Sequence, residues 1–183
     1  MLISRREAVR ILLDEGGMTG EAQAQGLLRA GAAGPGVVTG PGVLFEDDRV
    51  LALARRPWLD ETAQDSAHRL GVYVARIPRS AVVDLTRPWH EVAAQVDRVP
   101  PMPTMTMAVL QMTVQAATRL PWVATLHGFV VLGADLTGIV TDDPSPRRFR
   151  LQPPGEWFGA WHEHRIVSPR GGRSWVIRRA RAS

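Results

Sequence analysis

The chain has 183 residues, of which 45% are hydrophobic and 22% charged, a globular composition that excludes wholesale disorder and a coiled-coil rod. It has no cysteine and no run of 18 apolar residues, which excludes disulfides, thiol chemistry and an apolar membrane span. All 22 cationic residues are arginine and the formal net charge is +4, but residues 1–65 carry seven arginines and ten acidic residues (net −3), whereas residues 66–183 carry 15 and eight (net +7).

The first predicted element is a helix over residues 5–14. Ser4 is a good N-cap, and Glu7 follows it at the spacing of a capping box. Apolar residues recur at i, i+3 and i+4 from Val9, which predicts one buried stripe. The glycine pair at 16–17 ends the helix.

A second helix is predicted over residues 20–30, with Thr19 as its N-cap. Beyond it, short β-like runs at 37–38 and 43–45 flank a turn that contains glycine and proline. This pattern predicts a β-hairpin.

Acidic residues at 46–48 favour the start of a third helix, predicted over residues 48–56. The elements up to this point form a first unit over residues 1–59. The polar stretch that follows predicts a linker over residues 60–70, and the rest of the chain, 71–183, forms a second unit.

The second unit begins with a predicted strand over residues 72–77. A helix of about fifteen residues starts at Thr104 and is apolar nearly all round, which predicts a helix buried on most sides. Four more strands follow, of which the first three form an antiparallel meander: residues 122–132, 136–141, 148–152 and 174–178. The fold class is therefore α+β.

Helix, glycine turn, helix, hairpin and helix follow one another in the order of a winged helix-turn-helix unit. The first third of the chain thus resembles the DNA-binding domains of excisionases and MerR-type regulators. The resemblance is carried by the capped segment at 4–8, the turn at 16–17, the helix after Thr19, the hairpin over 37–45 and the helix over 48–56.

In that family the second helix enters the major groove and the hairpin touches the DNA backbone. The resemblance implies groove-facing polar side chains on and before the second helix: Thr19, Gln23, Gln25 and Arg29. Glutamine pairs with adenine and arginine with guanine. The resemblance also implies phosphate contacts from arginines outside that helix: Arg5, Arg6, Arg10, Arg55 and Arg56. The net charge of −3 and the absence of a basic residue in the hairpin turn favour another interpretation, a degenerate winged helix that binds protein.

The chain beyond Arg165 combines arginine with Trp175, a mixture that can grip phosphates and stack on bases. The arginines assigned to this role are Arg173, Arg178 and Arg179. The alternative is an ordinary solvated tail.

Aromatic residues at 157, 158 and 161 have helical spacing, and either pack in the core or floor a ligand pocket. His162 and His164 share a face if they lie on a strand, but nothing in the sequence fixes a third ligand, so no metal is expected. The chain contains no phosphate-binding, dinucleotide or nucleophile-elbow motif. We therefore expect neither an enzyme nor a cofactor.

The leading hypothesis is a bacterial transcription regulator that binds double-stranded DNA. Its second unit would dimerise or sense a ligand. The alternative is a protein-interaction adaptor that binds no nucleic acid. Three arginines in the first ten residues, with no apolar run after them, predict a chain without a secretory signal and a location in the cytoplasm, away from the membrane.

Overall fold

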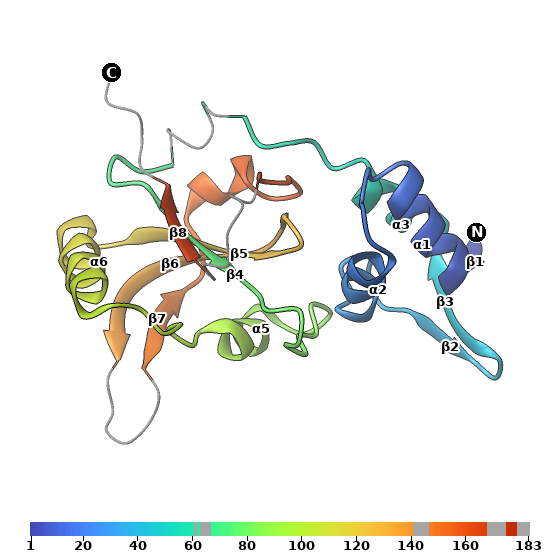
Figure 1. Ribbon diagram of the computed structural model, residues 1–183, viewed down its shortest axis with the longest axis horizontal. Helices are drawn as coiled ribbons and strands as arrows, with labels where there is room; N and C mark the ends of the chain where they lie inside the picture. The colour runs from blue at the N-terminus through green and yellow to red at the C-terminus, as the bar shows by residue number, and fades with distance from the viewer. Residues whose placement is uncertain (61, 63–66, 141–146, 168–174, 179–183) are drawn as a thin grey trace.

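The computed structural model describes residues 1–60, 62, 67–140, 147–167 and, as backbone, 175–178. Figure 1 shows two lobes, each built around one sheet. The N-terminal lobe runs from strand β1 to helix α3, and the C-terminal lobe runs from strand β4 to strand β8. Helices and sheets occur in both lobes, so the α+β class is confirmed.

The first helix, α1 (Arg5–Asp14), has the bounds that its sequence predicts. The Ser4 hydroxyl accepts a hydrogen bond from the Glu7 amide at 3.2 Å and satisfies one of the free donors of the first turn. Gly17 has a φ of +58°, in the left-handed region. A Cβ at Gly16 would lie 2.4 Å from the Leu12 carbonyl oxygen. The glycine pair is therefore required for the chain to leave the helix here.

The second helix, α2, spans Glu21–Arg29, and its N-cap is Gly20. The prediction that Thr19 caps this helix was wrong. Gly20 adopts the extended cap conformation, with φ −145° and ψ 128°, and no side chain bonds to the free amides. Thr19 is exposed one residue before the cap.

The sheet of the N-terminal lobe has the strand order β1-β3-β2. Strands β2 (Val37–Thr39) and β3 (Gly42–Glu46) form the predicted hairpin. Strand β1 (Leu2–Ser4) pairs antiparallel with β3 and was not predicted, because three residues carry too little periodicity. Helix α3 (Asp47–Ala54) completes the lobe.

The sheet of the C-terminal lobe has the strand order β7-β6-β5-β4-β8. Strands β5 (Leu120–Leu126), β6 (Phe129–Val140) and β7 (Arg148–Gln152) form an antiparallel meander. Strand β4 (Val72–Arg76) runs parallel to β5 and antiparallel to β8 (Trp175–Arg178), so the sheet as a whole is mixed.

The strand boundaries in the meander differ from the prediction. The chain turns at His127 and Gly128, whose φ angles are +53° and +88°. Two central residues with positive φ are typical of a type I′ hairpin. Gly133, which the sequence placed in a turn, instead lies inside β6. A Cβ there would lie 2.3 Å from the Phe158 ring, so this glycine makes room for a close side chain.

Helices α5 (Trp89–Val96) and α6 (Thr104–Ala117) connect β4 to β5, as a parallel strand pair requires. Helix α6 differs from the expectation of a helix buried on most sides. Met107, Leu110 and Val114 are buried, whereas Met105 and Met112 are 79% and 68% exposed. No helix in the described part of the chain is long and apolar enough to cross a bilayer.

Alternate residues of the central strands contribute to two apolar layers. Tyr73 and Trp122 belong to the large cluster that also holds Leu110 and Val114 of α6 and buried residues of α5 and the N-terminal lobe. Val72 and Val123 point into a smaller cluster around Trp161, which follows the 3₁₀ helix η1 (Glu156–Ala160). The sheet therefore carries helices on one face and the η1 segment on the other.

The side chain of Arg165 joins the two lobes. Its guanidinium donates hydrogen bonds to the carbonyls of Gly16, just past the end of α1, and Ala54, the last residue of α3. It also lies 4.9 Å from the ring centroid of Phe129 and 5.4 Å from that of Trp58. A cation at two helix C-termini satisfies carbonyls that have no partner within the helices. Burial lowers the pKa of Arg165.

We predict that Leu110→Asp unfolds the C-terminal lobe. Leu110 has no exposed surface, and burying an unpaired carboxylate costs several kcal/mol, comparable with the stability of a whole domain. Thermal unfolding followed by circular dichroism measures the effect. Met112→Asp on the exposed side of the same helix is the control and keeps the parent Tm. Equal melting of both variants would contradict the placement of α6.

We predict that Arg165→Met lowers the free energy of unfolding by about 3 kcal/mol, because two charge-assisted hydrogen bonds and two ring contacts are lost while the aliphatic bulk is kept. Urea unfolding measures the difference. Arg150→Met on β7, where the arginine is exposed, is the control. A change no larger than that of the control would show that Arg165 does not hold the lobes together.

Candidate nucleic-acid interface

Helix α2 presents one open face. Glu21, Gln25 and Arg29 are four residues apart, so they follow one another along the same side of the helix. Ala24, Leu27 and Leu28 are buried on another side. The Gln25 amide nitrogen donates to the Glu21 carboxylate at 3.0 Å. The face thus combines an acidic residue, an amide and an arginine.

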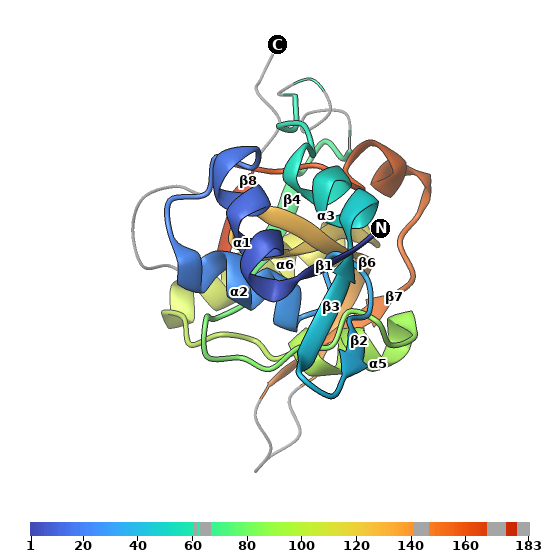
Figure 2. The same ribbon diagram turned by 90° about the vertical axis from the view of Figure 1, so that its right-hand side faces the viewer.

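Two of the predicted phosphate-binding arginines lie beside this face. Arg6 and Arg10 of α1 line a groove of about 520 Å³, and Glu21 of α2 forms part of its other wall. Arg10 is paired with Glu7 at 3.5 Å, with both side chains largely exposed. Arg5 is exposed at the start of α1. Figure 2 shows α1 and α2 together in the lobe nearest the viewer.

Gln23 lies away from the open face. It is two residues before Gln25, which places it about 160° around the helix from that residue. Like Gln25 it is half-buried, and its side chain lies close to Gly20. Of the two glutamines selected from the sequence, only Gln25 shares a face with Arg29.

The C-terminal lobe touches another side of α2. A Cβ at Gly26 would lie 2.9 Å from Nε2 of His127, in the β5–β6 turn. Just beyond the helix, the Ala30 carbonyl accepts a hydrogen bond from the Leu85 amide at 2.8 Å. These contacts set the orientation of α2 against the larger lobe and leave the face of Gln25 and Arg29 open.

Arg55 and Arg56, at the end of α3, do not join the arginines of α1. Arg55 pairs with Glu15 at 3.3 Å. Arg56 donates to the Val130 carbonyl of the C-terminal lobe at 3.2 Å. Burial lowers the pKa of Arg56, and the negative charge of Glu163 partly offsets this. Both arginines line a cleft of about 590 Å³ between the lobes.

The aromatic residues near 160 pack in the C-terminal lobe. The Trp157 indole donates to the buried Asp135 carboxylate at 2.7 Å, and Trp161 is fully buried. Phe158 lies against Gly133. Trp161 is thus a core residue, whereas Trp157 and Phe158 are partly buried and pack against the same cluster. Asp135 was not singled out from the sequence, because its indole partner lies on a distant segment.

The histidines at 162 and 164 follow η1 and do not lie on a strand. Nδ1 of His164 is 2.8 Å from the His162 carbonyl oxygen, and the His162 ring packs against Phe158. Within the described ranges, no three histidine or carboxylate side chains gather closely enough to hold a metal ion.

The predicted contacts of the arginine-rich tail fall largely beyond what the structure covers. Arg173 and Arg179 lie outside the described residues, and Arg178 is described only as the last backbone position of β8. Their assignment to phosphates stays a prediction.

We predict that the contact between His127 and α2 weakens at acid pH. Burial, and to a lesser extent the charge of Arg79, lower the pKa of His127 below its unfolded value of about 6.5. At acid pH the unfolded chain then binds more protons than the folded chain. The stability contributed by neutral His127 is therefore complete above the unfolded pKa of about 6.5 and is lost as the pH falls through the lower folded pKa.

Urea unfolding at about pH 7.5 and about pH 5.5 measures this loss. His127→Asn removes the titration and tolerates the positive φ. The parent loses more stability between the two pH values than the variant does. The pKa of His68 is also lowered, mainly by burial. Because His68 is present in both proteins, its contribution to the loss of stability cancels in the comparison. Equal losses would contradict the prediction.

The comparisons with known proteins found no match. No protein family, no curated protein and no solved structure matches the chain. The likeness to excisionase and MerR-type domains stays a prediction based on the order of the elements.

Proposed function

We propose that the protein is a cytoplasmic DNA-binding protein, of the kind that regulates transcription, and that its N-terminal lobe contacts double-stranded DNA. The observation that carries the proposal is the groove that Arg6 and Arg10 of α1 share with Glu21 of α2, from which Gln25 and Arg29 follow along the same side of α2. Arginines of the first helix would contact phosphates, and the second helix would meet base edges.

The arrangement of the lobes supports this proposal. The C-terminal lobe contacts α2 at Gly26 and at Ala30 just beyond it, and Glu21 and Arg29 on the neighbouring side of the helix stay exposed. A reading helix has to be exposed and also held at a fixed angle, because base readout depends on direction. The acidic side chains of Glu7 and Glu21 within the same surface oppose phosphate binding. The salt dependence of the affinity is then set by the number of phosphates that the arginines neutralise.

The proposal predicts that the intact protein binds duplex DNA fragments with a Kd below about 10 μM at low salt. The double variant Arg6→Ala/Arg10→Ala flattens the slope of log K against log salt by about two units, close to one per lost phosphate contact. Fluorescence anisotropy over a range of salt concentrations measures both quantities.

Arg147→Ala/Arg150→Ala removes the same charge from exposed positions at β7 and is the matched control, which keeps the parent slope. If no fragment binds, or if both double variants change the slope equally, the N-terminal lobe does not contact DNA through α1.

A second candidate function is a protein-interaction adaptor, and the observation that favours it is strand β2. This strand is at the edge of its sheet, and Val38 on it is 81% exposed. A free edge with apolar side chains accepts an added strand from a partner. A protein partner that stays bound after nuclease treatment and in high salt would favour the adaptor.

A further inference from the structure

A cavity of about 620 Å³ opens in the C-terminal lobe where β4 ends. The sheet curls strongly at this place. Tyr73 of β4 and Phe149 of β7 have ring centroids 5.1 Å apart, although two strands separate β4 from β7 in the sheet. The cavity is at the mouth of this curl, between the end of β4, the end of α5 and the start of β7. Clefts of this size at the ends of strands commonly hold small molecules.

The walls of the cavity are apolar and its charged groups have one sign. Ala75, Ile77, Val96 and Val99 belong to the walls, together with prolines at 78, 100 and 101. Arg76, Arg98 and Arg148 are the charged side chains of the lining, which includes no acidic residue. Arg148 is paired at 3.2 Å with Asp97, which is not itself a lining residue. Val82, on the loop after β4, lines the cavity and is 94% exposed.

We propose that this cavity binds an organic monocarboxylate with an apolar body. A guanidinium presents a fork of donors that matches a carboxylate, and the apolar walls favour a hydrocarbon chain or ring behind it. A ligand body in the cavity would also cover Val82. A polar ligand with several charges would leave the apolar walls without a partner.

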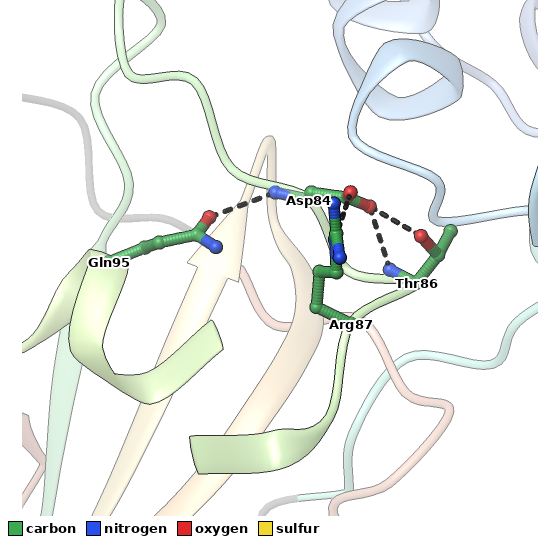
Figure 3. Close-up of polar contacts among 4 residues, drawn as sticks. All are labelled: Asp84, Thr86, Arg87 and Gln95. Atoms are coloured by element: carbon green, nitrogen blue, oxygen red, sulfur yellow. Dashed lines mark hydrogen bonds and ion pairs between the residues drawn. The ribbon is translucent and has the colours of Figure 1, made fainter. Parts of the chain in front are cut away.

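Gln95 connects the cavity to the turn that supports the end of α2, the helix proposed to contact base edges. Its side chain lines the cavity, and its carbonyl oxygen accepts a hydrogen bond from the Asp84 amide at 3.0 Å. The Asp84 carboxylate in turn holds the Thr86 amide and hydroxyl, at 3.1 and 2.5 Å, and the Arg87 guanidinium (Figure 3). Leu85, within this turn, donates its amide to the Ala30 carbonyl after α2.

A carboxylate in the cavity would attract the amide nitrogen of Gln95, which the bond to Asp84 does not use. Movement of this side chain would shift the turn that supports the end of α2. We therefore infer that ligand binding changes DNA affinity. This effect rests on the proposed function, whereas the binding of a carboxylate in the cavity is independent of that function.

Isothermal titration calorimetry of the intact chain with 4-phenylbutyrate tests the cavity, and the neutral 4-phenylbutan-1-ol is the matched ligand. The acid binds with one site per chain, and the alcohol binds at least about tenfold more weakly, since it lacks the charge-assisted contacts. No binding of the acid up to about 10 mM, or equal binding of both compounds, overturns the proposal.

Two pairs of variants locate the site. Arg98→Ala weakens binding of the acid by about tenfold or more, while Arg150→Ala, on β7 and outside the lining, does not. Ala94→Trp fills the cavity from the exposed end of α5 and abolishes binding, while Ala116→Trp on the exposed side of α6 does not. Binding that is unchanged in both Arg98→Ala and Ala94→Trp overturns the assignment of the site.

Titrations of duplex DNA with and without 4-phenylbutyrate test the coupling. A change in DNA affinity that the alcohol does not produce, and that is lost in Ala94→Trp, supports it. DNA binding that the acid leaves unchanged overturns the coupling. If no DNA binds at all, the proposed function fails, and the calorimetry still decides whether the cavity is a carboxylate site.

Discussion

One guanidinium, that of Arg165, bridges the two lobes. Arg165 enters the N-terminal lobe and meets the carbonyl ends of α1 and α3, which have no partner of their own. Its backbone also exchanges hydrogen bonds with the segment after α3, from Arg165 N to Pro57 O at 2.8 Å and from Leu59 N to Arg165 O at 2.7 Å. Arg56 reaches back in the opposite direction to Val130. Each lobe therefore supplies a cation to the other.

This arrangement divides the arginines into two groups with different roles. Arg56 and Arg165, at the junction, donate to carbonyls of the other lobe and hold the lobes together, while Arg55 pairs with Glu15 inside the N-terminal lobe. Those on the first helix point to solvent beside α2. The proposed interface with DNA uses the second group together with Arg29 of α2. Helix α2 meets the large lobe through His127 at Gly26 and through the Leu85 amide at Ala30, so a change at the sheet is transmitted to α2 by these contacts.

The N-terminal lobe could be predicted because its signals are local. The Ser4 cap and the glycine pair at 16–17 act within one helical turn of their own position. The C-terminal strands could not be divided correctly, since Gly133 is needed for packing against Phe158 and not for a turn. Arg56 was assigned to phosphate because no local pattern reveals its contact with Val130, 74 residues further along the chain.

The long separation along the chain between Arg165 and its partners has a consequence for synthesis. The guanidinium caps carbonyls that precede it by 149 and 111 residues. At about 5–20 residues per second, α1 leaves the ribosome on the order of ten seconds before this cation does. During that interval α1, α2 and α3 have to hold together through their own apolar contacts. The nascent lobe is then open along the side that Arg165 later closes.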